Sequence, residues 1–171
     1  MVHPFLCLRR RHHHQRLGLR RAEEQDDAVL VQPLLAILAE QKLDFHLIFR
    51  HLTRFRPALM LSSSLDAFIG TLIGFTSAAT GALERDDAAA KQHWRNWLEK
   101  YAARIESEKD EWTASSANSE GGDWHALREK EARLANPRFV LRQWVLEEVI
   151  AKVEAGAEGG RSILAKVMQV R

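Results

Sequence analysis

The spacing of apolar residues along this chain is helical from Asp27 onward. Apolar positions recur three or four residues apart, the period that places side chains on one face of an α-helix. No stretch alternates apolar and polar residues convincingly, as a half-buried β-strand would. We therefore predict an all-α fold, an irregular helical bundle. The predicted helices are residues 26–41, 43–52, 59–83, 84–112, 123–135, 136–156 and 162–170.

Several of these helices have recognisable starts. Aspartate and serine side chains accept hydrogen bonds from the free backbone amides of a first helical turn, so they are favoured as N-caps. Pro33 falls late in the first helical pattern, and we expect it either to begin the regular helix or to kink it. The expected N-caps are Asp26 or Asp27, Asp44, Asp123 and Ser162.

Tryptophans lie on the predicted inner faces of three helices. Because tryptophan is large and mostly apolar, we expect these residues, including Trp144, to pack in the core rather than to form a ligand box. The inward positions expected in the two helices before residue 136 are Trp94, Trp97, Leu98, Tyr101 and Ile105 in residues 84–112, and Trp124, Leu127 and Leu134 in residues 123–135.

Residues 59–83 carry a single charge, Asp66. This run raises the alternative of a membrane-spanning helix, and Gly70 with Gly74 has the spacing that lets helices approach closely. Threonines and serines interrupt the run, so we favour a buried helix of a bundle. If the rest of a larger protein normally covers it, its apolar face is exposed here and available for association. That face comprises Phe68, Ile69, Leu72, Ile73 and Phe75.

Charge is distributed unevenly along the 171 residues, although the formal net charge is only +2. Residues 1–21 hold six arginines and four histidines with no acid, and the acidic stretch "AEEQDD" follows. We expect residues 1–21 to form a basic, disordered tail, with a mitochondrial presequence as the alternative on composition. Residues 22–171 are then the helical region. The single cysteine, Cys7, excludes an internal disulfide.

Some segments resemble reactive sites, but none has the full pattern that its chemistry needs. Residues 155–162, "AGAEGGRS", lack the first glycine and the lysine of a phosphate-binding loop and follow a helix rather than a strand. His12, His13 and His14 could bind a metal, yet they lie in the predicted tail without a rigid scaffold. We predict no catalytic, cofactor-binding or metal-binding residue in this chain. Other side chains set aside are Ser62–Ser64 with Asp66, the pair Glu147 and Glu148, and His46, His51, His93 and His125.

The most distinctive segment is "NPRFVLRQWVLEEVIAKVEAG", residues 136–156. Asn136 is a strong N-cap, Pro137 suits the first helical position, and Gly156 is placed to end the helix. The segment resembles the C-terminal signature of the selenoprotein O family, whose bacterial members are called YdiU. Three further stretches resemble family segments in the same order, so the resemblance spans about residues 15–168. They are "QRLGLR", "LVQPLLAILAEQKLDFHLIFRHL" and "WRNWLEKYAARI".

This resemblance implies a function for the full-length relatives. Members of the family look like protein kinases in fold and transfer AMP from ATP to hydroxyl side chains of proteins, with Mg²⁺ or Mn²⁺. For this chain it implies the C-terminal helical part of that fold. The family residues that bind ATP and metal have no counterparts in this sequence.

We therefore expect a fragment of such an enzyme that is inactive alone and needs no cofactor of its own. Protein substrates and ATP belong to the full-length family, and we expect neither a nucleic-acid nor a membrane partner. The alternative is a non-enzymatic helical module that binds other proteins. Eukaryotic relatives imply a mitochondrial location, and otherwise we expect a cytoplasmic one.

Overall fold

The computed structural model describes residues 13–75, 87–116, 122–136 and 143–154. The chain divides into two compact units, Met1–Asn136 and Pro137–Arg171. All described elements are helical and none is a strand, which confirms the all-α prediction. The first unit contains η1 (Asp27–Val31), α2 (Gln32–Glu40), α3 (Phe45–Leu52), η2 (Pro57–Leu61), α4 (Leu65–Gly74), α5 (Asp87–Glu106), α6 (Lys109–Ser116) and α7 (Trp124–Ala135).

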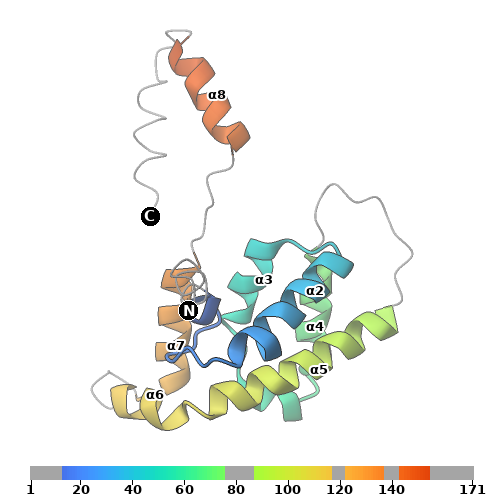
Figure 1. The fold of residues 1–171 in the computed structure, drawn as a ribbon, viewed down its shortest axis with the longest axis vertical. Helices are drawn as coiled ribbons and strands as arrows, with labels where there is room; N and C mark the ends of the chain where they lie inside the picture. Colours follow the sequence, from blue (N-terminus) through green and yellow to red (C-terminus); the bar gives the residue numbers. More distant parts are fainter. Residues whose placement is uncertain (1–12, 76–86, 117–121, 137–142, 155–171) are drawn as a thin grey trace, which may run out of the picture. The chain divides into compact units, whose positions relative to one another are not determined.

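Most of the first unit packs against α5. This helix contacts η1, α2, η2 and α4, and Figure 1 shows it running alongside them. The N–H of Trp94 donates to the Gln41 side-chain oxygen at 3.1 Å, and that of Trp97 to the Leu30 carbonyl at 2.9 Å. A buried indole N–H needs such a partner, so these tryptophans have a packing role as predicted. The predicted inner face is buried throughout, at Trp94, Trp97, Leu98, Tyr101 and Ile105.

Two of the predicted N-caps are confirmed. The Asp44 carboxylate accepts hydrogen bonds from two backbone amides of α3, and the Asp123 carboxylate accepts one from the amide of His125 at 2.9 Å. Pro33 lies in the first turn of α2, directly after the π-helical turn η1, so it begins the regular helix. Asp26 precedes η1 but makes no capping bond at this helix start. Its carboxylate is used in the site described below.

The single helix predicted for residues 84–112 is wrong, because α5 ends at Glu106 and α6 begins at Lys109. At the break, the amide of Glu108 bonds to the carbonyl of Ile105 at 3.1 Å, a tighter turn than that of an α-helix. The turn directs the Glu108 side chain into the protein, where it is fully buried. The helical region also extends past residue 112, its predicted end, because α6 continues to Ser116.

The apolar stretch predicted as one helix over residues 59–83 is divided between η2 and α4, and residues 76–83 lie outside the described part. Ile69 and Leu72 are fully buried in the core of this chain. The expectation of an exposed face is therefore wrong for these two residues, because the chain's own helices cover them. Phe68, Ile73 and Phe75 are half-buried against the core, and association through them stays a prediction. Within the described residues, no helix has the length and apolar character to cross a membrane.

The buried face of α7 differs from the predicted one. Arg128 and Ala132 are buried, four residues apart and in phase with Trp124. Leu127 is half-buried, but Leu134 is 81% exposed, so its predicted inward orientation is wrong. The inner face of this helix thus depends on an arginine, which apolar periodicity does not indicate.

The second unit contributes α8, Gln143–Glu154, to the description. This helix confirms the central part of the helix predicted for residues 136–156. Residues 137–142, the end near Gly156, the loop at 155–162 and the helix predicted at 162–170 lie outside the described residues. Asn136 closes the C-terminal end of α7 in the first unit, where its amide bonds to the carbonyl of Arg133 at 3.2 Å.

Candidate functional site

Residues 13–21 belong to the packed first unit, which corrects the expectation that they are part of a disordered tail. Residues 13–16 form a helical turn, and Leu17 and Leu19 after it are buried in the core. Burial of a leucine side chain contributes about 1.5–3 kcal/mol, enough to hold an otherwise basic segment against the bundle. Residues 1–12 lie outside the described part of the chain.

Five polar side chains hold the backbone of residues 16–21, and we call them the clamp. Each makes at least one hydrogen bond to that backbone. The bonded residues are separated by 83 to 120 positions in the sequence, so only the tertiary fold brings them together. The clamp residues are Tyr101, Arg104, Glu108, Arg128 and Asn136.

Glu108 is the anionic centre of the clamp and has 0% of its surface exposed. Its carboxylate accepts hydrogen bonds from the backbone amides of Arg20 at 2.8 Å and Arg21 at 2.9 Å. It also forms an ion pair with Arg104, with 2.9 Å between Nη1 and Oε1. A buried carboxylate is tolerated when it is both paired and hydrogen-bonded, and Glu108 meets both conditions. Two loop amides are satisfied by the same group.

Arg104 connects Glu108 to the start of η1. Its Nε donates to the Asp26 carboxylate at 2.8 Å, and its Nη2 donates to the Arg21 carbonyl at 2.9 Å. Burial acts to lower the pKa of Arg104, but the hydrogen bond that Arg104 donates to Asp26 and the charges of Glu108 and Asp26 outweigh it, so this pKa is raised. The guanidinium therefore stays charged and joins the end of α5 to two segments near the N-terminus.

Arg128 is 1% exposed and has no carboxylate partner among the described residues. It donates instead to the carbonyls of Thr53 and Phe55, in the turn that follows α3, and to the Leu17 carbonyl at 3.3 Å. Each carbonyl oxygen is a hydrogen-bond acceptor with partial negative charge, so three of them together stabilise the buried cation. Burial raises the pKa of Tyr101, with Arg128 opposing. Tyr101 is thus a neutral hydroxyl that donates to Leu17 and accepts from Arg128.

Gly18 lets this segment pass close to Arg128. Its φ of +67° lies in the left-handed region, which residues with a side chain rarely adopt. A Cβ atom here would lie 2.9 Å from Arg128 Nη1 and 3.0 Å from Ala132 Cβ. Both the backbone conformation and the close approach therefore require glycine.

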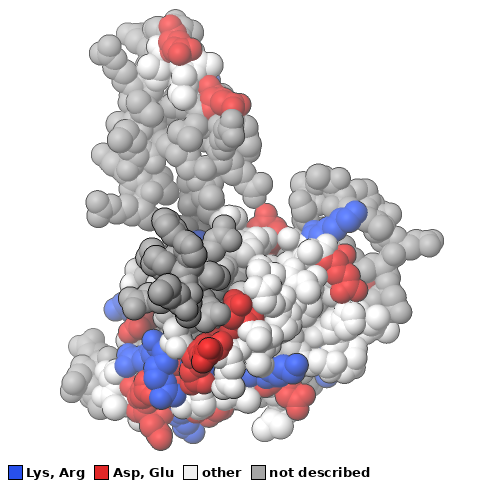
Figure 2. Space-filling model, in the orientation of Figure 1, with Lys and Arg blue, Asp and Glu red and all other residues white. Residues whose placement is uncertain are grey.

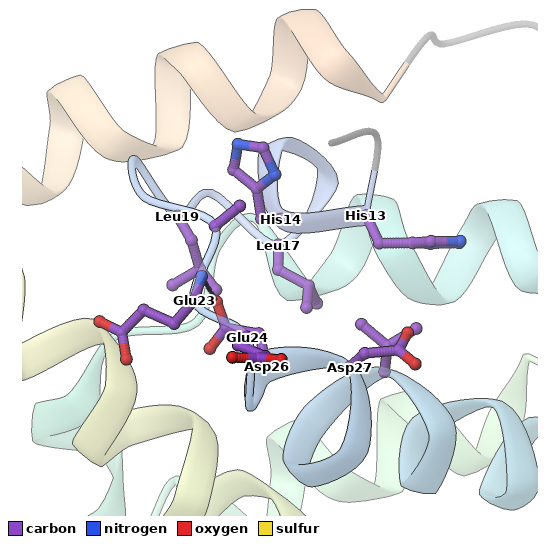
Figure 3. A pocket seen from close by; sticks show the side chains of 10 residues that line it. His13, His14, Leu17, Leu19, Glu23, Glu24, Asp26 and Asp27 are labelled. Atoms are coloured by element: carbon purple, nitrogen blue, oxygen red, sulfur yellow. Dashed lines mark hydrogen bonds between the residues drawn. The ribbon is translucent and has the colours of Figure 1, made fainter. Parts of the chain in front are cut away.

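A cavity of about 350 Å³ lies beside the clamp. One part of its lining is apolar and another part carries four carboxylates, as Figure 3 shows. The ring of His14 points away from the carboxylates of Glu24 and Asp26. The side chains that line the cavity are His13, His14, Leu17, Leu19, Ala22, Glu23, Glu24, Asp26, Asp27 and Val31.

Glu23 and Asp26 are paired with Arg21 and Arg104, whereas Glu24 and Asp27 have no ion pair within the described residues. These two carboxylates suit a cation and disfavour a phosphate, because they repel an anion. The described residues contain no group of three or more His, Cys, Asp or Glu side chains that could hold a metal ion, and His12 lies outside them. On the face drawn in Figure 2, acidic side chains gather near the centre with basic ones beside them. The surface is of mixed sign there rather than a basic patch.

The other side chains considered from the sequence are dispersed over the first unit. Burial, with a smaller effect of neighbouring arginines, lowers the pKa of His51 and lowers that of His125 to about 4. His93 lies 3.6 Å from a Glu40 carboxylate at the surface. Ser62–Ser64 are exposed and precede α4, where the Ser64 amide bonds to the Ser62 hydroxyl at 3.0 Å. His46 packs edge-on against a phenylalanine.

The clamp was missed because its residues are charged or polar, although the signal is present in the sequence. Tyr101, Arg104, Ile105 and Glu108 are spaced i, i+3, i+4 and i+7, so both charges are in phase with the buried stripe. Arg128 is in phase with the buried Ala132 in the same way. A charged residue in phase with an apolar stripe is a candidate for burial, but the sequence does not show which distant groups would pair with it.

The fold and the clamp define a helical scaffold in which buried charged side chains hydrogen-bond to backbone groups of the same chain. Comparison with known proteins places it in a family. The sequence model described as "Protein adenylyltransferase SelO" matches residues 8–169. The chain belongs to this family, as the resemblance of residues 136–156 and the preceding helices indicated.

Curated relatives agree with this assignment. The chain is similar to the protein nucleotidyltransferase YdiU of Xanthomonas campestris pv. campestris (strain B100), with 30% identity over 96% of this chain and 27% of the relative. It is also similar to the YdiU proteins of Photobacterium profundum (30%, over 91% of this chain and 26% of the relative) and Pseudomonas fluorescens (31%, over 89% and 24%). The chain thus spans about a quarter of the length of these relatives. No solved structure matches it.

Proposed function

We propose that this chain supplies the C-terminal helical scaffold of a SelO-type protein adenylyltransferase, which transfers AMP from ATP to protein hydroxyl groups. In this proposal, ATP and Mg²⁺ or Mn²⁺ are held by parts of the enzyme that this sequence does not represent. The chain alone then carries out no transfer. Its membership of the family and its coverage of about a quarter of the YdiU relatives support this assignment.

The observation that carries the proposal is that the two buried arginines, Arg104 and Arg128, are bonded to groups of the chain itself. Nucleotidyl transfer depends on positive groups that neutralise phosphate charge and position the reacting atoms. Arg104 is engaged by Asp26 and Glu108, and Arg128 by backbone carbonyls and Tyr101. These interactions stabilise the fold and leave neither guanidinium for a nucleotide. The acid-rimmed cavity beside them does not fit a triphosphate either.

The direct test measures AMP transfer by the purified chain. The chain is incubated with α-labelled ATP, Mg²⁺ or Mn²⁺ and a generic protein acceptor, and the intact Xanthomonas campestris YdiU protein is assayed in parallel. We expect label incorporation by the relative and none by the chain. Saturable, metal-dependent incorporation by the chain would show that it contains a complete nucleotide site, and the proposal would be wrong.

A second test addresses the scaffold role itself. The region of the Xanthomonas campestris relative that matches this chain is deleted, and transfer and thermal unfolding are measured on the truncated enzyme. A scaffold that packs on the catalytic part should be needed for stability, so both activity and the unfolding temperature should fall. A truncated enzyme as active and as stable as the intact one would contradict this role.

A further inference from the structure

A groove between η2 and α5 has the chemistry of a docking site. η2 lies against α5, and the two elements with His125 of α7 enclose a groove of about 560 Å³. Leu61, at the end of η2, is 96% exposed at this groove, next to the partly exposed Met60. A single exposed leucine is common on protein surfaces, but one beside an open apolar groove marks a place where a partner can bury it.

Two carboxylates lie on the α5 side of the groove. Glu99 and Glu106 line it and are seven residues apart on α5, two turns along the same face and about 10 Å apart along the axis. Glu99 has no ion-pair partner in the described part of the chain, and the pair of Glu106 with Lys109 is long, at 3.9 Å. Both carboxylates are exposed, so they are available to a cation that approaches from outside.

His125 lines the groove and has one polar atom that is unsatisfied. Nδ1 of His125 is buried and has no hydrogen-bond partner in the structure. Burial, together with the positive charges of Arg128 and Arg56, lowers the pKa of His125 to about 4, so the imidazole is neutral at pH 7. The neutral ring therefore adds no charge to the groove, and the charge of the groove is set by the carboxylates that line it.

We propose that this groove docks a segment of the SelO-type enzyme that this sequence does not represent, one that presents an apolar side chain next to a lysine or arginine. The apolar side chain packs on Met60 and Leu61, and the cation pairs with Glu99 and Glu106. This inference rests on the proposed function, because the chain spans about a quarter of its YdiU relatives and a scaffold must contact the remainder.

The test uses short overlapping peptides that tile the part of the Xanthomonas campestris YdiU protein outside the matched region. Binding to the intact chain is followed by fluorescence polarisation. We expect the peptides that bind to contain Lys or Arg beside a Leu, Ile, Val or Phe residue. Their affinity should fall with added salt, because the pairs with Glu99 and Glu106 are exposed.

Two matched variants locate the binding site. Leu61→Asp should weaken binding about tenfold or more, because it removes an apolar contact and places a charge in the groove. Leu134→Asp is the control, since Leu134 is also highly exposed but does not line the groove, and it should change affinity by less than about twofold. Urea unfolding of both variants should stay within about 1 kcal/mol of the parent chain, because neither side chain is buried and the only added cost is a carboxylate in the last turn of α7 in Leu134→Asp.

The remaining outcomes are decisive. Binding by no peptide, binding only by acidic peptides, or equal effects of Leu61→Asp and Leu134→Asp would overturn the proposal. Self-association of the chain that Leu61→Asp abolishes, seen by light scattering, would assign the groove to a second copy and overturn it too. Each of these results leaves the proposed function standing. That function fails only if the chain alone transfers AMP or the truncated relative keeps full activity and stability.

Discussion

Replacement of Glu108 by glutamine is the sharpest test of the clamp. The substitution keeps the size and shape of the side chain and removes only its charge. The Glu108 carboxylate accepts two backbone amides and pairs with Arg104, all without solvent contact. In Glu108→Gln, the side-chain oxygen can accept one of these amides, but the new NH₂ group meets the other amide as a second donor. Arg104 keeps Asp26 and Glu23 as close anions, at 2.8 Å and 3.3 Å.

The expected cost follows from these contacts. A hydrogen bond to a charged group contributes about 1.5–3 kcal/mol. Removal of one partner from a buried ion pair costs about 3–5 kcal/mol. Because Arg104 retains Asp26 and Glu23 and one amide remains bonded, we expect Glu108→Gln to lower the free energy of unfolding by about 2–4 kcal/mol. Single domains are stable by only about 5–15 kcal/mol, so this loss is large.

Urea unfolding followed by tryptophan fluorescence measures this change, because Trp94, Trp97 and Trp112 are buried in the same unit. With a typical denaturant slope of about 2 kcal/mol per molar, the midpoint should fall by about 1–2 M. Glu106→Gln is the matched control, because Glu106 is exposed and its one ion pair within the described residues, with Lys109, is long at 3.9 Å. It should change stability by less than about 0.5 kcal/mol. Equal midpoints for the two variants would refute the buried clamp.

Three further predictions concern the first unit. Gly18→Ala should lower the free energy of unfolding by about 1–3 kcal/mol, since the residue has φ +67° and a Cβ atom would contact Arg128. Gly70 lies in a helix with open space around it, so Gly70→Ala should raise the free energy of unfolding by about 0.5–1 kcal/mol. Urea midpoints that move in the same direction for both variants would contradict this prediction. Asp44→Ala should cost about 1 kcal/mol by loss of a helix cap, and an unchanged thermal unfolding temperature would argue against the cap. The folded pKa of His125, about 4, lies below its ordinary 6.5, so the unfolded chain takes up this proton first as pH falls. The contribution of the neutral His125 side chain to the free energy of unfolding is therefore complete above about pH 6.5 and is lost as the pH falls towards 4. Discounted for partial solvent exposure, it amounts to about 1–2 kcal/mol, and His125→Asn should reduce this pH dependence of the urea midpoint.

Local features of the sequence determine most of the helices and their inner faces. The face of α5 that contains Trp94 and Trp97 is predicted by apolar spacing, and the starts of α3 and α7 are predicted by Asp44 and Asp123. These predictions succeed because a helical stripe and an N-cap depend on residues within a few positions of each other. The family is indicated by the same kind of local pattern, in residues 136–156.

Only the tertiary structure decided how residues 13–21 are held and where the long helix after residue 84 breaks. Residues 16–21 read as a basic tail because the groups that fix them, such as Glu108 and Arg128, lie 83 to 120 positions away. The break between α5 and α6 likewise contains no proline or glycine from which it could be predicted. A charged side chain can be buried only where distant partners satisfy it, and no local pattern can show that such partners will meet.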